Sequence, residues 1–95
     1  MHIGQAIKEV RKVKGISQAE LAEKCDITQT AISYIERGTH GPSPETLERI
    51  AKGLETLVPL LWLMAISANQ IPASKKILFK ELMPVIKDLI IKLIC

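Results

Sequence analysis

The chain has 95 residues, of which 47% are hydrophobic and 24% are charged, and its formal net charge at neutral pH is +3. Ninety-five residues make one small domain with a modest core and leave room for a short extension. The mean hydropathy of +0.19 is high for a small soluble monomer and indicates apolar surface that a partner covers.

Several classes of protein are disfavoured by the sequence. The longest apolar run, residues 57–66, holds ten residues, about half of the roughly 20 that a membrane-spanning helix needs. The first ten residues contain no apolar stretch typical of a signal peptide, so we expect a cytoplasmic protein. The two cysteines and two histidines lack the spacing of metal ligands, and no catalytic motif is present. We therefore predict a non-enzymatic protein without metal or cofactor.

Three helices are predicted in the first part of the chain, over residues 3–14, 18–25 and 29–37. Apolar residues recur at helical spacing in each of them, and Gly15 ends the first. The residues expected to face inward are Ile3, Ile7, Val10, Leu21, Cys25, Ile32 and Ile35.

The starts of the second and third helices carry clear local signals. Ser17 and Glu20 form an S-x-x-E capping box, and Thr28 is a typical N-cap for the third helix. A tight turn at residues 26–27 joins the two helices. Asp26 occupies the turn position that needs a left-handed backbone, which aspartate tolerates better than most side chains. This stretch therefore has the layout of a helix-turn-helix.

Two further helices follow a glycine-rich loop. Ser43 caps the fourth, which begins at Pro44 and carries an apolar stripe. The fifth begins at Pro59, and because it is apolar nearly all round we expect it to be buried. The stripe of the fourth helix consists of Leu47, Ile50, Ala51 and Leu54. No strand-like alternation occurs, so the predicted fold class is all-α.

Charge is unevenly distributed along the chain. Residues 1–74 hold eight basic and eight acidic side chains, whereas residues 75–95 hold five lysines against two acidic residues. A surface that attracts a polyanion would therefore depend on local grouping rather than on the total. The candidates for such a group are Lys8, Arg11, Lys12, Lys14 and Arg37.

Residues 75–95 form a predicted amphipathic helix with a wide apolar face, in which Pro84 indicates a kink or a division. One apolar row consists of Phe79, Met83, Ile86, Ile90 and Leu93, and an adjacent row of Leu78, Leu82, Val85 and Leu89. Three interpretations are open: a dimer interface, a helix packed on its own domain, or a basic amphipathic helix on a membrane surface. The first is favoured, and its predicted contacts are Phe79, Leu82, Met83, Ile86, Leu89, Ile90 and Leu93.

The segment QAELAEKCDITQTAISYIERG, residues 18–38, resembles the helix-turn-helix of phage repressor and Cro proteins, known as the XRE family. The resemblance extends over residues 3–55. It implies a five-helix repressor-like DNA-binding domain over residues 1–66, followed by a linker over 67–74 and the helical tail over 75–95. It also implies a sequence-specific transcriptional regulator, favoured here as a repressor, that binds an inverted-repeat operator in double-stranded DNA as a homodimer.

The family's DNA contacts carry over to particular positions. By resemblance, Gln18 binds a phosphate and braces Gln29, the first residue of the recognition helix, whose amide can pair with adenine. The expected base-facing set is Thr28, Gln29, Thr30, Ser33 and Tyr34. Phosphate contacts are expected from Arg11, Gln18, Arg37, Thr39 and His40.

The family also often pairs the residues that correspond to Arg11 and Glu36. Such a pair would join the first and third helices and leave Arg11 near a phosphate. As a surface pair it would contribute only ~0–1 kcal/mol to stability, so we expect its role to be orientation.

Other binding functions remain open at this stage. An antitoxin of a toxin–antitoxin pair would use the same domain to bind its own operator and would give its tail to a protein partner. An interaction module that has lost DNA binding is a further alternative.

Overall fold

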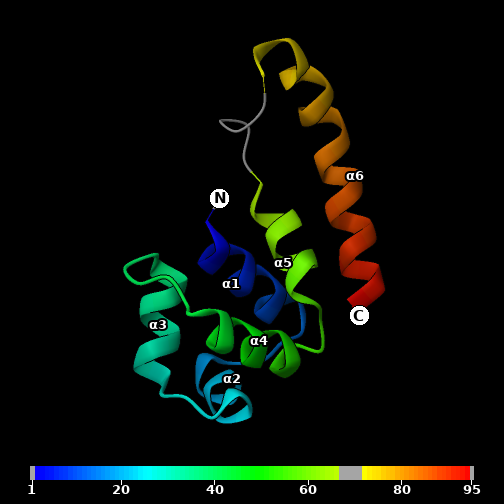
Figure 1. The fold of residues 1–95 in the computed structure, drawn as a ribbon. Helices are drawn as coiled ribbons and strands as arrows, with labels where there is room; N and C mark the ends of the chain where they lie inside the picture. The colour runs from blue at the N-terminus through cyan, green and yellow to red at the C-terminus, as the bar shows by residue number, and fades with distance from the viewer. Residues whose placement is uncertain (1, 67–71, 95) are drawn as a thin grey trace.

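The computed structural model describes residues 2–66 and 72–94, and all regular secondary structure within these ranges is helical. The prediction of an all-α fold is therefore confirmed. Figure 1 shows α1 to α5 gathered into a bundle, with α6 standing at one side. The elements are α1 (Ile3–Val13), α2 (Gln18–Cys25), α3 (Gln29–Arg37), α4 (Pro44–Gly53), α5 (Val58–Ala65), the 3-10 turn η2 (Ala73–Lys75) and α6 (Lys76–Ile94).

The predicted helix starts are confirmed in atomic detail. Ser17 accepts a hydrogen bond from the backbone N–H of Glu20 at 3.0 Å, and the Glu20 carboxylate accepts one from the N–H of Ser17 at 3.1 Å. Thr28 caps α3 and Ser43 caps α4 through their side-chain oxygens. Asp26 adopts the left-handed conformation with φ 56°. The boundaries of α2 and α3 thus follow from local capping chemistry.

One hydrophobic core joins α1 to α5. The predicted inward-facing residues of the first four helices are buried, as is Leu61 in α5. The largest fully buried side chains are Ile7, Val10, Leu21, Ile32, Ile50, Leu54, Leu61 and Met64. Because these residues come from all five helices, the core fixes the bundle as one unit.

Gly4 permits α1 to cross α3 at very close range. A Cβ atom at this position would overlap the carbonyl oxygen of Ile35. Backbone atoms cannot move aside as a flexible side chain could, so this crossing requires the absence of a side chain. A similar constraint of lesser severity holds at Gly53, where a Cβ would meet the sulfur of Cys25 at 2.9 Å.

The fifth helix is only partly buried, which corrects the expectation that it is covered all round. Leu61 and Met64 are fully buried, but Trp62 is 53% exposed and Leu57, just before the helix, is 65% exposed. The core covers one side of α5 only. No element among the described residues covers the other side, where Trp62 lies.

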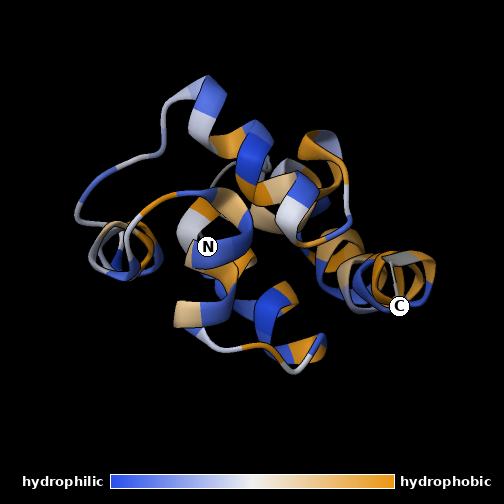
Figure 2. Cartoon of the chain, turned by 90° about the horizontal axis from the view of Figure 1, so that it is seen from below, coloured by the Kyte–Doolittle hydropathy of each residue, from blue (hydrophilic) through white to orange (hydrophobic). Residues whose placement is uncertain are grey.

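The last helix is continuous through Pro84, so of the kink or division predicted there, the division is wrong. Its two apolar rows have different environments. Met83 and Ile90 are buried, and Ile90 joins the core of the bundle. The adjacent row is exposed, and Figure 2 shows hydrophobic residues on several sides of α6. The exposed apolar residues of α6 are Ile77, Leu78, Leu82, Val85, Leu89 and Leu93.

The set of residues predicted to form a dimer interface is therefore divided between two surfaces. Ile86 and Ile90 pack against the core of their own bundle and Met83 is buried, while Leu82, Leu89 and Leu93 are exposed. The predicted linker over residues 67–74 is described only from Pro72 onward, where η2 leads into α6. In the described ranges, no helix combines the length and the apolarity that crossing a membrane requires.

The Gly4 crossing yields a test of the fold. Helix propensity alone favours alanine over glycine by about 1 kcal/mol inside a helix. Because the added Cβ meets the α3 backbone, we expect Gly4→Ala to lower the free energy of unfolding instead, by roughly 1–3 kcal/mol. Urea denaturation measures this change. Gly41→Ala is the control, since a Cβ there meets nothing within 4 Å; equal stability of both variants would contradict the close crossing.

Candidate nucleic-acid interface

A polar hollow of about 310 Å³ lies where the starts of α2 and α3 meet. Gln18 begins α2 and Gln29 begins α3, so the helix-turn-helix geometry brings both amides to the same surface. The hollow is lined by Gln18, Gln29, Thr30, Ser33, Tyr34 and Arg37. Six of the ten residues predicted from the sequence to contact DNA thus share one surface.

The first turn of α3 is open to a ligand. Thr28, Gln29 and Thr30 are exposed, and Ser33 is half-buried one turn further along the helix. No acidic residue lies in this turn, so no side chain of the turn itself neutralises the partial positive charge of the helix N-terminus. An anion or a hydrogen-bonding base edge is therefore favoured at this position.

Tyr34 stands at the far side of the hollow with its ring held by two neighbours. The guanidinium carbon of Arg37 lies 5.0 Å from the ring centroid, and the His40 ring meets it edge-on at 5.5 Å. Arg37 also donates from Nε to the carbonyl of Ser33 at 3.4 Å. Tyr34 remains 39% exposed, so the aromatic face is oriented by these contacts but not covered by them.

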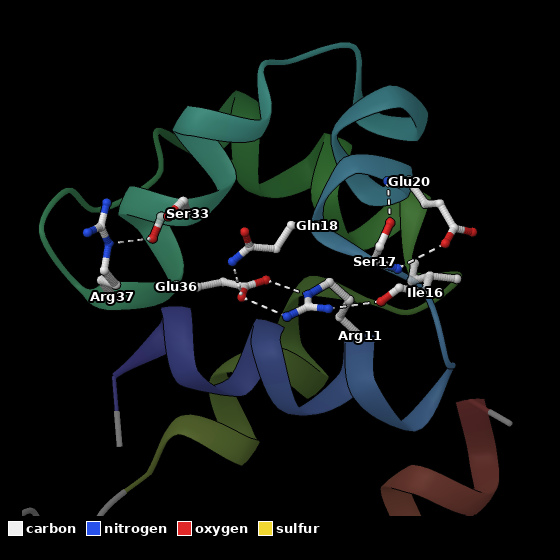
Figure 3. Close-up of polar contacts among 8 residues, drawn as sticks. All are labelled: Arg11, Ile16, Ser17, Gln18, Glu20, Ser33, Glu36 and Arg37. Atoms are coloured by element: carbon white, nitrogen blue, oxygen red, sulfur yellow. Dashed lines mark hydrogen bonds and ion pairs between the residues drawn. The ribbon is translucent and has the colours of Figure 1, made fainter.

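Arg11 and Glu36 form a bidentate ion pair between α1 and α3 (Figure 3). Arg11 Nε lies 2.7 Å from Glu36 Oε2, and Arg11 Nη2 lies 3.0 Å from Oε1. The pairing expected from the family resemblance is present, but the expectation of a surface pair is wrong. The two side chains are 10% and 2% exposed, because the α1–α3 crossing closes over them.

The burial of Arg11 also bears on its expected contact with a phosphate. A third donor of the guanidinium, Nη1, binds the carbonyl oxygen of Ile16 at 2.9 Å. Arg11 thereby ties α3 to the segment that leads into α2. With these donors engaged inside the chain, the geometry supports a role in positioning the two motif helices, and a direct phosphate contact stays a prediction.

Glu36 also binds Gln18, a contact that the sequence did not predict. The Gln18 amide donates to Glu36 Oε1 at 3.0 Å, instead of bracing Gln29 as the resemblance implied. Glu36 therefore accepts hydrogen bonds from both α1 and α2, as Figure 3 shows. No local pattern pairs Gln18, the first residue of α2, with Glu36 near the end of α3. Only the tertiary packing shows that the two side chains meet.

Thr39, His40 and Cys25 do not line the polar hollow. Thr39 and His40 are exposed in the loop after α3. Cys25 is buried between α2 and α4, and burial raises the pKa of its thiol despite the nearby charge of Lys24. It therefore behaves as a small core residue. Among the described residues, no group of histidine, cysteine and carboxylate side chains could hold a metal ion.

Comparisons with known proteins agree with this geometry. A family model described as helix-turn-helix matches residues 7–63, more than half of the chain. The immunity repressor protein of Bacillus phage phi105 is 41% identical over 54 residues, 57% of this chain and 38% of the repressor. The HTH-type transcriptional regulator SinR of Bacillus subtilis (strain 168) is 43% identical over 60 residues, 62% of this chain and 54% of SinR. The chain thus spans about half of the length of SinR and a smaller share of the phage repressor.

A solved structure extends the similarity to the fold. A mutant of the restriction-modification controller protein C.Esp1396I superposes with a TM-score of 0.62 at 36% sequence identity. The match covers 80% of this chain and 88% of the controller protein.

The buried ion pair yields a test of positioning. Removing Arg11 leaves the buried charge of Glu36 without its ionic partner. We therefore expect Arg11→Ala to lower the free energy of unfolding by about 3–5 kcal/mol. The double variant Arg11→Met/Glu36→Leu replaces the pair with apolar groups and should recover most of that loss. Urea denaturation compares the variants, with Arg49→Ala as the control.

Arg49 suits this comparison because it pairs with Glu45 at 3.1 Å on the surface, where such pairs contribute ~0–1 kcal/mol. A loss at Arg11 no larger than the loss at Arg49 would contradict the buried role.

Proposed function

Because this chain belongs to the helix-turn-helix family of the phage repressor and Cro type, we propose that it is a transcriptional repressor that binds its operator in double-stranded DNA sequence-specifically as a homodimer. The observation that carries the proposal is the polar hollow shared by the starts of α2 and α3. An exposed helix N-terminus with amide and hydroxyl side chains has the form and chemistry of a reading element for the major groove.

Two kinds of DNA contact are proposed for this surface. Gln29 reads a base edge, since its amide offers the donor and acceptor that pair bidentately with adenine. Thr28, Thr30, Ser33 and Tyr34 flank it as further base-facing residues. Gln18, Arg37, Thr39 and His40 contact the phosphate backbone, which fixes the register of α3 on the duplex.

Glu36 has an indirect part in this scheme. Its carboxylate holds Gln18 at 3.0 Å and Arg11 at 2.7 Å, so the first residue of α2 is oriented before DNA arrives. A preoriented side chain loses less entropy when it binds. We therefore propose that Arg11 and Glu36 are positioning residues for the phosphate contact of Gln18.

Homodimer formation is proposed to use the exposed apolar residues of α6. Six large side chains of this helix are exposed, from Leu82 at 46% to Ile77 at 76%. Burial of each large aliphatic side chain contributes roughly 1.5–3 kcal/mol, and several together can exceed the cost of association.

The immunity repressor and SinR relatives support a regulatory role.

The roles of Gln29 and Gln18 can be separated by mutation. Gln29→Ala should cost roughly 1–3 kcal/mol of binding free energy on the preferred operator and relax specificity at one base pair. Gln18→Ala and Arg37→Ala should weaken binding to operator and random DNA alike, because phosphate contacts carry no sequence information. Fluorescence anisotropy with both duplexes measures this.

Gln5→Ala supplies the matched control, since Gln5 is an exposed glutamine on α1 outside the hollow. Its substitution should leave both affinities unchanged. Equal losses for Gln29→Ala on operator and random DNA would overturn its role as a base-reading residue.

The operator itself provides a second test. A two-fold dimer presents two recognition helices, so DNA fragments selected from a random pool should contain an inverted repeat. Half-site centres should lie about 10 bp apart or a multiple of that, which places both helices on one face of the duplex. Affinity should fall steeply with salt. Selection of an unrepeated half-site would argue against a dimer, and failure to select any sequence would argue against DNA binding.

A further inference from the structure

A second hollow, larger than the polar one, opens between the start of α1 and α5. Its volume is about 680 Å³. Its lining includes His2, Ile3, Pro59, Trp62, Leu63 and Ile66, with no lysine, arginine or carboxylate among the lining residues. Trp62 is the only tryptophan of the chain and is 53% exposed. A ligand for this hollow must therefore present an apolar surface.

The first half of α6 extends beyond the bundle (Figure 1). Its last turns are held by Ile90 in the core and by an ion pair of Lys87 with Glu9 at 4.0 Å. Its first turns lack such support, since Ile77 is 76% exposed and Leu78 is 51% exposed. The outward-facing residues Leu78, Leu82, Val85 and Leu89, here called the outer row of α6, cannot be covered by the helix's own bundle in this arrangement.

We propose that the outer row of α6 in one copy of the chain docks into the Trp62 hollow of a second copy, and that the two copies do so reciprocally. This inference rests on the homodimer proposed above and specifies its architecture. In a two-fold dimer each protomer contributes both surfaces, so every contact occurs twice. The dimer is then a mutual exchange of helices rather than a coiled coil between the two α6 helices.

The area that a stable dimer needs supports a two-part interface. A standard interface buries about 800 Å² per partner, against a total surface of 5925 Å² for this chain. A single apolar patch on a monomer typically measures about 300–600 Å², which falls short. The outer row of α6 and the Trp62 hollow are two separate apolar surfaces, and the reciprocal arrangement buries both.

The charges beside the outer row favour a second copy over a lipid surface. Glu81 lies three residues after Leu78 and four before Val85, so it borders the row on the helix surface. Asp88 follows on the same side, where it pairs with Lys92 at 3.1 Å. Lys92, three residues after Leu89, lies at the same border, so the border carries two carboxylates (Glu81 and Asp88) and one ammonium group (Lys92). An amphipathic helix that binds an anionic membrane carries an excess of lysine or arginine there. The carboxylates can remain in water at the rim of a protein interface.

Trp62 reports on this docking directly. Sedimentation gives the dimer dissociation constant, and tryptophan emission is recorded across the same concentrations. We expect the emission of Trp62 to shift to shorter wavelength as the dimer forms. Leu78→Asp should weaken the dimer roughly tenfold or more and remove the shift, because it buries an unpaired charge. Trp62→Ala should weaken the dimer by a comparable factor, as central tryptophans do in interfaces.

Ser74→Asp is the matched control, since it adds the same charge at an exposed position just before α6 and should preserve both the dimer and the shift. Leu78 is exposed, so its substitution should leave the thermal unfolding of the bundle unchanged.

Two outcomes would overturn the inference. The first outcome combines two results. The intact chain forms a dimer but its Trp62 emission stays constant, and a Leu82→Cys variant in a Cys95→Ser background rapidly forms a disulfide between two copies. That result would place the two α6 helices against each other and leave the proposed DNA-binding dimer intact. The second is a chain that remains monomeric at every concentration, which also removes the dimer from the proposed function. Loss of DNA binding alone would affect only the proposed function.

Discussion

The helix-turn-helix arrangement depends on the hydrogen bonds that the buried carboxylate of Glu36 accepts. It accepts hydrogen bonds from Arg11 on α1 and Gln18 on α2, while its own backbone belongs to α3. Arg11 further binds the carbonyl of Ile16 ahead of α2. A buried charge with incomplete partners is costly, so the three helices can satisfy this network only in a narrow range of relative positions. The network therefore contributes orientation as well as stability.

The close crossing of α1 and α3 makes that network possible. Gly4 brings α1 against the backbone of Ile35, and this proximity excludes water from the neighbouring Arg11–Glu36 pair. In the low dielectric that results, the ion pair is stronger than it would be at the surface, and its rupture is more damaging. A missing side chain on one helix and a charged pair further along it thus act together to hold the proposed recognition helix.

Apolar surface remains exposed at the opposite part of the molecule. The bundle of α1 to α5 has its own core, to which α6 adds Ile90 and the partly buried Ile86. The outer row of α6 and the exposed face of α5 at Trp62 therefore lie open in the single chain. The high mean hydropathy of +0.19 is explained by these two surfaces rather than by an unusually large core. Their mutual burial in a dimer would remove both from water without altering the proposed DNA-binding surface.

The sequence by itself determined the helices, their capping residues and the inward stripes of α1 to α4, because these depend on neighbours within four residues along the chain. It also indicated the family, through the spacing of the motif. The tertiary structure alone decided that Arg11 and Glu36 are buried, that Gln18 binds Glu36, that Trp62 is exposed and that α6 continues through Pro84. Each of these depends on which helix lies against which, and residues 25 positions apart, such as Arg11 and Glu36, have no local pattern that specifies their distance or their burial.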